Sequence, residues 1–305
     1  MDCTVDRITL RKLIGKTPMM KLTLEGSRIW LKLEGNNIGG SVKDRAAWGM
    51  FRFAEIEGKL QKGATIVEPT SGNTGIGFAM LGASLGLKVI LTMPESMSLE
   101  RRSVLSAYGA EVVLTPAETG MKGAVETAQK IVSETPRAFM PDQFSNPGNP
   151  WAHQVTTGPE IVADLKGRGI AAFVAGVGTG GTLTGVGRIV KAAFPDAQVI
   201  AVEPQKSAVL SGESAGRHAI EGIGAGFVPK NLDLSIIDRV VQVSDEAAME
   251  MARLLAQKEG LFVGISTGAN VWAAMALARE IEGNIVTISP DRGDKYLSTA
   301  AFKTS

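Results

Sequence analysis

The chain has 305 residues, 44% of them hydrophobic, which is enough apolar material for the cores of two domains. Its 32 Lys and Arg residues are balanced by 31 Asp and Glu residues, and the net charge of +1 excludes a general electrostatic attraction to nucleic acid or to an anionic membrane. We therefore expect small-molecule partners, with no nucleic acid and no membrane.

The amino-terminal segment and the cysteine content predict the compartment. A single cysteine, Cys3, cannot form an internal disulfide and fits a reducing environment. The first residues, MDCTVDRITLRKLIGK, mix charges throughout and lack the apolar core of a secretory signal. No run approaches the roughly 18 apolar residues of a membrane span. We expect a cytoplasmic protein.

Short runs rich in β-branched residues alternate with longer helix-like segments, a pattern typical of parallel strands joined by crossover helices. The sequence therefore predicts an α/β fold. Several of these runs are continuously apolar, as strands covered on both faces should be. The predicted strands are 29–34, 64–68, 88–93, 111–114, 171–175, 198–203 and 284–289.

One helix and one linker are marked clearly by their residue types. Segment 244–260 (SDEAAMEMARLLAQKEG) predicts a helix, because Ser244 can cap its start and Gly260 can end it. Segment 141–150 (PDQFSNPGNP) contains three prolines and a glycine, which disfavour helix and strand. This linker predicts two domains: a smaller one of residues 40–145, and a larger one of residues 1–39 with 146–305.

Two glycine-rich turns follow predicted strands and open predicted helices, where backbone N–H groups and the helix dipole favour an anion. The first turn is Thr70-Ser71-Gly72-Asn73-Thr74-Gly75, which follows ATIVEP. Its hydroxyls and amides suit a carboxylate or a phosphate. An ordinary capped helix start explains the same residues.

The second turn, GVGTGGT at residues 176–182, matches the dinucleotide pattern G-x-G-x-x-G. Glu203 lies 22 residues after Gly181, at the end of a predicted strand, where such folds place an acidic residue that binds ribose. The same glycines fit a lone phosphate equally well, because they let its oxygens approach the backbone.

A lysine in the segment SVKDR decides between these readings. Lys43 falls at the expected start of a helix, with Ser41 as a candidate cap. A cation there is disfavoured by about 0.3–1 kcal/mol, which favours the neutral, nucleophilic amine that a Schiff-base lysine needs. Most surface lysines are simply solvated charges, so the argument depends on the neighbouring motifs.

Four segments in order, SVKDR, TSGNTG, GTGGT and GISTGA, resemble the cysteine synthase (O-acetylserine sulfhydrylase) family of fold-type II pyridoxal-phosphate (PLP) enzymes. The last of them is another predicted strand-to-helix turn. The resemblance covers nearly the whole chain, including IGKTPMMKL and QFSNPGNPWAHQVTTGPEI. It implies PLP as the cofactor and two α/β domains, each with a twisted, largely parallel sheet flanked by helices.

The resemblance also implies roles for single residues. Lys43 would carry the cofactor as the internal aldimine and later move the α-proton, Asn73 would bind the cofactor 3'-hydroxyl, and Ser266 would face the pyridine nitrogen. Gln143 would help the first glycine-rich turn to bind the substrate. The implied phosphate cradle is Gly178, Thr179, Gly180, Gly181 and Thr182, and the implied carboxylate-binding residues are Thr70, Ser71, Gly72 and Thr74.

The implied reaction is a β-replacement that makes L-cysteine from O-acetyl-L-serine and sulfide through an aminoacrylate, with Lys43 as base and then acid. A neutral hydroxyl at Ser266 need not keep the ring nitrogen protonated, which favours elimination of the β-substituent over transamination.

Marks of two isozyme types within the family are mixed. PTSGNTG, DQFSNP and EGIGAGF resemble the A type, whereas EGNN and DRGD resemble the B type, which accepts sulfur donors such as thiosulfate. Asp291, Arg292 and Asp294 are candidates for polarising the sulfur-donor pocket, although a solvated charge cluster explains them more simply. By resemblance we expect a homodimer, with the C-terminal tail of serine acetyltransferase as a candidate partner.

Several alternatives stay open. O-phosphoserine sulfhydrylases and cystathionine β-synthases share the fold and cofactor, and a non-catalytic relative would bind a ligand or an acetyltransferase as a regulator. An NAD-dependent oxidoreductase rests on the glycine pattern and Glu203 alone, and it leaves Lys43 unexplained. We expect no catalytic metal, because His153, His218 and one cysteine give no ligand spacing.

Overall fold

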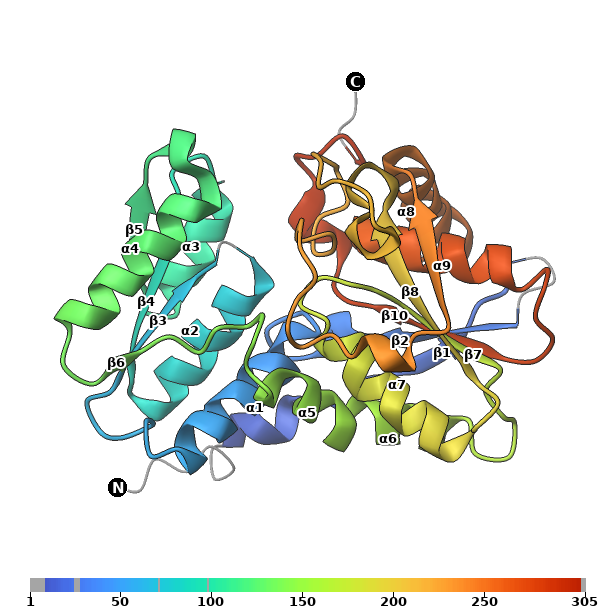
Figure 1. Cartoon of the computed structure of the whole chain (residues 1–305), viewed down its shortest axis with the longest axis horizontal. Coiled ribbons are helices and arrows are strands. Elements are labelled where there is room, and N and C mark those ends of the chain that lie inside the picture. The colour runs from blue at the N-terminus through green and yellow to red at the C-terminus, as the bar shows by residue number, and fades with distance from the viewer. Residues whose placement is uncertain (1–8, 25–27, 71, 98, 303–305) are drawn as a thin grey trace. The chain divides into compact units, whose positions relative to one another are not determined.

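The computed structural model describes the chain except for residues 1–8, 25–27, 71, 98 and 303–305. It divides into two compact units (Figure 1). Unit 1 contains the described residues of Met1–Ile14 and Lys43–Ala152, and unit 2 contains those of Gly15–Val42 and His153–Ser305.

This division differs from the predicted one most at the amino terminus, and by a few residues elsewhere, since residues 40–42 lie in unit 2 and residues 146–152 in unit 1. Residues 9–14 lie with unit 1, whereas the sequence placed residues 1–39 in the larger domain. The reason is packing: Ile14 is buried in the core of unit 1, and the Arg11 guanidinium stacks over the ring of Trp48 at 3.9 Å.

Unit 1 is built on a four-stranded sheet in the order β5-β4-β3-β6. Every neighbouring pair in it is parallel. Its strands are β3 (Thr65–Pro69), β4 (Lys88–Pro94), β5 (Glu111–Thr115) and β6 (Ala138–Phe139), and its helices are α1 (Lys43–Ile56), α2 (Asn73–Leu85), α3 (Leu99–Ala107), α4 (Gly120–Glu134) and the first part of α5 (Gly148–Val155).

The two faces of this sheet are covered by different helices. Ile66 and Leu91 pack into the cluster that holds α1 and α2, where Phe51 and Phe78 stack at 5.5 Å. The next residue along β3, Val67, packs with Ala128 of α4 on the other face. Successive side chains along a strand point to opposite faces of the sheet. A strand in a sheet with helices on both faces therefore needs apolar residues throughout.

Unit 2 is built on a six-stranded sheet in the order β1-β2-β10-β7-β8-β9. Only β1 is antiparallel to its neighbour among these strands. The strands are β1 (Met19–Lys21), β2 (Ile29–Leu33), β7 (Ala172–Gly176), β8 (Gln198–Pro204), β9 (Arg239–Val243) and β10 (Ile285–Ser289), and the helices are α6 (Thr157–Asp164), α7 (Gly181–Ala193), α8 (Asp245–Glu259) and α9 (Ile265–Leu277).

The same alternation gives unit 2 its two helical layers, which Figure 1 shows on opposite sides of the sheet. Val174 of β7 packs with Leu255 of α8 and Ala269 of α9. Its neighbour Phe173 packs with Val186 of α7 on the other face. The carboxyl ends of β7 and β9 are followed by turns that lead into the covering helices α7 and α8, and α/β folds place their ligands at this end of the sheet.

The structure confirms the α/β class and all seven predicted strands to within a residue. Helix α8 also begins and ends as predicted, because Ser244 accepts the N–H of Ala247 and Gly260 takes a left-handed conformation. Two expectations were wrong. Helix α5 begins inside the proline-rich segment, since Pro150 lies in its first turn, where no donor is required. Segment 264–270 follows an isolated bridge at Val263, not a strand.

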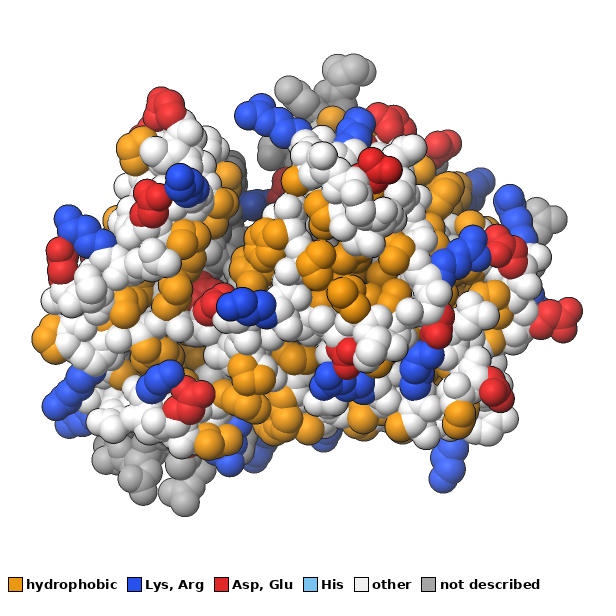
Figure 2. All heavy atoms as spheres, in the orientation of Figure 1, with side chains coloured by type: hydrophobic (Ala, Val, Ile, Leu, Met, Phe, Trp, Pro, Cys, Tyr) orange, Lys and Arg blue, Asp and Glu red, His pale blue; other side chains and the backbone are white. Residues whose placement is uncertain are grey.

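The surface agrees with the balanced charge of the sequence. On the face drawn in Figure 2, Lys and Arg side chains are interspersed with Asp and Glu side chains. Within the described ranges, no helix combines the length and apolar character that crossing a bilayer requires.

Candidate active site

Lys43 is the first residue of helix α1, directly after the point at which the chain passes from unit 2 into unit 1. Ser41 is not its cap, because Val42 precedes the helix and Ser41 instead bridges to Asp291. Helix α2 lies against this first turn: a Cβ on Gly77 would sit 3.2 Å from the carbonyl oxygen of Lys43. The glycine thus allows the helix opened by TSGNTG to lie beside the candidate lysine.

The predicted carboxylate turn opens α2. Thr70 lies at the end of β3 and accepts the N–H of Gly72 at 3.4 Å, and Gly72 is the N-cap residue of the helix. Asn73 and Thr74 form its first turn. Ser71, which was predicted to bind the carboxylate, lies outside the described residues. A helix N-terminus presents backbone N–H groups and the positive end of the helix dipole, which favour an anion.

Gln143 lies beside this turn. Its Oε1 accepts the hydroxyl proton of Thr74 at 2.6 Å, although the two residues are 69 positions apart. The backbone N–H groups of Gln143 and Asp142 donate in turn to the carboxylate of Glu68, at 3.0 and 2.9 Å. Unit 1 therefore contains most of the predicted active-site residues, on α1, at the turn between β3 and α2, and on the loop after β6. These residues are Lys43, Thr70, Gly72, Asn73, Thr74 and Gln143.

Glu68 is almost fully buried at 1% exposure. Burial raises the pKa of Glu68 to about 8, an effect larger than that of the two backbone N–H bonds, which lower it; the charge of Asp142 adds to the increase. Sequence reasoning missed Glu68, because its two backbone partners lie more than 70 positions away.

The predicted phosphate cradle follows β7 and leads into α7 in unit 2. Gly180 has φ of +80° at the N-cap, a conformation that glycine adopts without strain. A Cβ on Gly178 would collide with the carbonyl oxygen of Gly222, and one on Gly180 would lie 2.8 Å from the backbone nitrogen of Leu232. These turns can approach one another only with glycine at both positions.

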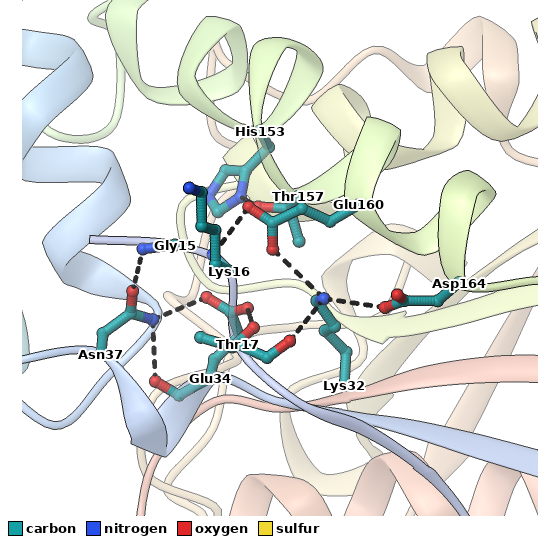
Figure 3. A network of polar contacts seen from close by, with 10 residues as sticks. All are labelled: Gly15, Lys16, Thr17, Lys32, Glu34, Asn37, His153, Thr157, Glu160 and Asp164. Atoms are coloured by element: carbon teal, nitrogen blue, oxygen red, sulfur yellow. Dashed lines mark hydrogen bonds and ion pairs between the residues drawn. The ribbon is translucent and has the colours of Figure 1, made fainter. Parts of the chain in front are cut away.

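The hydroxyl of Thr182 is connected to a buried histidine. Nε2 of His153 lies 3.3 Å from Oγ1 of Thr182, and its Nδ1 lies 2.8 Å from Oγ1 of Thr157. Figure 3 shows His153 and Thr157 beside a polar network, in which Lys32 of β2 contacts Glu160 and Asp164 of α6 at 3.2 and 3.1 Å. In the sequence analysis His153 was weighed only as a metal ligand. In the structure it contacts Thr182 of the predicted phosphate cradle.

Ser266, in the first turn of α9, is 3% exposed and close to the same glycines. Its Oγ would lie 3.9 Å from a Cβ on Gly222. One turn later, Asn270 accepts the N–H of Gly176 and donates to the carbonyl of Ile288, both at 2.8 Å. Asn270 thus ties the start of α9 to the ends of β7 and β10, and it places Ser266 beside the predicted cradle.

The cradle residues fit the phosphate of PLP. The backbone N–H groups of residues 178–182 surround a helix N-terminus, two threonine hydroxyls add donors, and the turn contains no carboxylate that would repel a dianion. The glycines leave the approach to the backbone open. The donor set therefore matches a phosphate ester.

Glu203 does not act as the ribose-binding residue of a dinucleotide site. Its carboxylate is buried and accepts bonds from the backbone N–H groups of Leu210 and Ser211, at 2.7 and 3.1 Å, and from the Ser211 hydroxyl at 2.6 Å. Its acceptor capacity is used to hold that loop, which removes the feature that had favoured an oxidoreductase.

The DRGD segment separates into a buried and an exposed part. Asp291 is 1% exposed and accepts the hydroxyl proton of Tyr296 at 2.6 Å. Arg292 and Asp294 form a solvent-exposed ion pair at 3.5 Å. Across the part of the chain that the structure describes, no group of three or more His, Cys, Asp or Glu side chains is arranged to hold a metal ion; Cys3 lies outside that part.

Comparison with known proteins agrees with this geometry. A sequence model of the pyridoxal-phosphate dependent enzymes matches residues 10–291. The chain belongs to this family. Among PLP-dependent enzymes, a cysteine synthase of Staphylococcus aureus is 49% identical over 304 residues, which cover 98% of this chain and 97% of that protein.

Two solved structures of PLP-dependent enzymes extend the likeness to the fold. A cysteine synthase of Entamoeba histolytica gives a TM-score of 0.93 at 38% identity, covering 97% of this chain and 91% of the other. The O-acetylserine dependent cystathionine β-synthase of Helicobacter pylori gives 0.89 at 40% identity, covering 97% and 98%. The predicted family, fold type and cofactor are confirmed.

Proposed function

We propose that the protein replaces the acetoxy group of O-acetyl-L-serine with sulfide, releasing L-cysteine and acetate. The observation that carries this proposal is the assembly in unit 1: Lys43 opens α1 directly beside the helix whose N-terminal turn and Gln143 suit an α-carboxylate. An amine that moves a proton at the α-carbon and a site for the adjacent carboxylate are what such a substrate requires.

The cofactor-binding residues have separate tasks in this proposal. When bound, PLP would withdraw electrons from the α-carbon, so that the β-substituent can leave and a nucleophile can add at the β-carbon. Lys43 would hold the cofactor covalently and move the α-proton. Asn73 would donate to the cofactor 3'-hydroxyl, and Ser266 would present a neutral hydroxyl to the ring nitrogen, which favours β-replacement over transamination. The residues that would hold the phosphate are Gly178, Thr179, Gly180, Gly181 and Thr182.

The substrate is held through its carboxylate. The N-terminal turn of α2 contributes backbone N–H groups and the positive end of its dipole. The residues proposed to contact the carboxylate are Thr70, Ser71, Gly72, Thr74 and Gln143.

The visible absorption spectrum of the purified holoenzyme tests this proposal, with Lys43→Ala as the control. Adding O-acetylserine should change the cofactor band, and adding sulfide should restore it while cysteine accumulates. The Lys43→Ala protein should show neither change. A wild-type spectrum that does not respond to O-acetylserine would contradict the proposal.

Cystathionine formation is the second candidate, because the Helicobacter pylori enzyme is as similar in sequence as the cysteine synthase structure. Competition between sulfide and homocysteine in one reaction discriminates the two, since the ratio of products gives the ratio of kcat/KM values. Thiosulfate as sulfur donor and O-phosphoserine as substrate are tested in the same way.

For the assembly and the compartment we propose a homodimer in the cytoplasm, with serine acetyltransferase as a candidate partner through its C-terminal tail. Support comes from the family resemblance and from the single cysteine, which suits a reducing compartment. Sedimentation at several protein concentrations, with and without a tail peptide, tests both interactions.

A further inference from the structure

The buried side chain of Glu68 joins the strand before the turn at residues 70–75 to the loop that carries Gln143. Glu68 lies in β3, two residues before Thr70. Oε2 accepts the N–H of Asp142 and Oε1 accepts that of Gln143. One side chain therefore fixes two successive peptide groups of a segment that is 74 positions away in the sequence.

The backbone at this point takes an unusual conformation. Asp142 has φ of +57°, in the left-handed region that costs a non-glycine residue about 1 kcal/mol. Its own carboxylate accepts the N–H of Phe144 at 3.2 Å and the hydroxyl of Ser145, which closes the turn from the other side. The left-handed residue directs two neighbouring N–H groups at the same acceptor, Glu68.

The consequence falls on the side chain of Gln143. Its backbone N–H is held by Glu68, its carbonyl accepts Nδ2 of Asn149 at 2.9 Å, and its Oε1 accepts the Thr74 hydroxyl. Because Oε1 is an acceptor here, the amide presents Nε2 as its donor end, and a carboxylate needs donors. The orientation of Gln143 and Thr74 thus depends on the turn that Glu68 fixes.

We propose that Glu68 is a positioning residue for the amino-acid carboxylate: by holding the Asp142–Gln143 peptides, it keeps Gln143 and Thr74 oriented for substrate binding. This inference rests on the proposed function, in which those two residues contact the carboxylate. The carboxylate is bound in the ground state and in the transition state alike, so losing its positioning raises KM and leaves kcat nearly unchanged.

Glu203 provides a matched comparison, because it is equally buried and also accepts two backbone N–H groups, yet it lies in unit 2 and holds a different loop. The substitutions Glu68→Gln and Glu203→Gln make the same chemical change. In each variant the amide nitrogen faces an N–H donor, which leaves one buried donor without an acceptor. Both variants should therefore lose stability. If Glu68 positions the carboxylate-binding residues, only Glu68→Gln should also raise KM for O-acetylserine.

The test uses the holoenzymes of the wild type and both variants, with cofactor content checked by absorbance. For Glu68→Gln we expect KM for O-acetylserine to rise about ten-fold, equivalent to ~1.4 kcal/mol, with kcat within about three-fold and KM for sulfide unchanged. Glu203→Gln should keep the wild-type KM for O-acetylserine. Equal KM values in wild type and Glu68→Gln would overturn the inference and leave Glu68 as a loop cap.

Two further experiments keep the inference testable. The variant Asp142→Ala serves if Glu68→Gln does not fold, and a binding measurement serves if the proposed reaction is not observed. Asp142→Ala removes the side chain that closes the same turn and leaves Glu68 itself unsubstituted, and it should raise KM in the same direction. An unchanged KM counts against the inference. The dissociation constant of L-serine, which carries the carboxylate, is measured by calorimetry. If the wild type makes no cysteine, the proposed function fails, and a weaker L-serine affinity in Glu68→Gln still supports the positioning role. If the wild type does not bind L-serine, both fail.

Discussion

Gly77 of α2 packs against the backbone of Lys43 so closely that a Cβ would not fit without a shift. A Cβ built on Gly77 would lie 3.2 Å from the carbonyl oxygen of Lys43 and 2.9 Å from the Cβ of Ala47. Gly77→Val should therefore push the two helices apart and lower the free energy of unfolding by about 1–3 kcal/mol. Urea unfolding checks this, with Ala83→Val on the exposed face of the same helix as the control. Because valine has a higher helix propensity than glycine, a loss in Gly77→Val must come from packing; a Gly77→Val protein as stable as the wild type would contradict the close approach.

The pH dependence of stability should report on Glu68. Burial raises its pKa to about 8 from 4.5, so between those values the folded protein keeps a proton that the unfolded chain releases. Its contribution to the free energy of unfolding is complete below pH 4.5 and falls as the pH rises towards 8, by at most about 1.4 kcal/mol per pH unit.

Urea unfolding of wild type and Glu68→Gln at pH 5, 6, 7 and 8 measures this contribution. The stability advantage of the wild type over the variant should shrink across that range, because glutamine does not titrate. An advantage that grows with pH would show that the folded protein holds Glu68 ionised, with its pKa below 4.5.

Asn270 should matter for cofactor binding as well as for stability. Asn270→Ala leaves the N–H of Gly176 and the carbonyl of Ile288 without their partner, at a cost of about 1–3 kcal/mol. The start of α9 would then be free to shift, and the affinity for PLP should fall several-fold in fluorescence titrations of the apoenzyme.

Asn284 gives the control for this experiment. It also ties separate segments together, through Trp30, Arg168 and Gly169. It does so at the amino end of β10, whereas Asn270 contacts the carboxyl ends of β7 and β10. Asn284→Ala should reduce stability while the PLP affinity stays at the wild-type value. A similar loss of affinity in both variants would point to a general loosening of unit 2.

Lys32 in the network of Figure 3 should contribute more than a surface ion pair. It is 1% exposed and contacts Glu160, Asp164 and the carbonyl of Thr17. Both carboxylates are partly solvated, so we expect Lys32→Met to cost about 1–3 kcal/mol in thermal or urea unfolding. Lys88→Met removes an exposed pair with Glu111 and should change stability by less than about 0.5 kcal/mol. Equal effects would show that burial of Lys32 adds nothing.

The sequence predicted features whose cause is local. Apolar runs predicted the central strands, and Ser244 and Gly260 predicted both ends of α8, because cap residues act within a few positions. The three-residue β1, the two-residue β6 and the five-residue β9 were missed, since each gains its strand conformation from pairing with a neighbour at a sheet edge. A brief strand carries little pattern of its own.

The candidate site divides in the same way. The glycine-rich turns were visible because loops that approach anions need glycine and hydroxyl residues in sequence. The residues that hold those turns were not visible. Glu68 acts on Asp142 and Gln143, and Asn270 acts on Gly176, across separations that no local pattern encodes.

The position of β10 has a consequence for the order in which the chain acquires structure during synthesis. Residues 285–289 are synthesised after every other strand of the six-stranded sheet, yet β10 lies between β2 and β7 in it. The sheet of unit 1, by contrast, needs nothing beyond Phe139. The smaller sheet can therefore form while translation continues, whereas β1 and β2 must wait for a strand about 250 residues downstream, exposed to chaperones until it arrives.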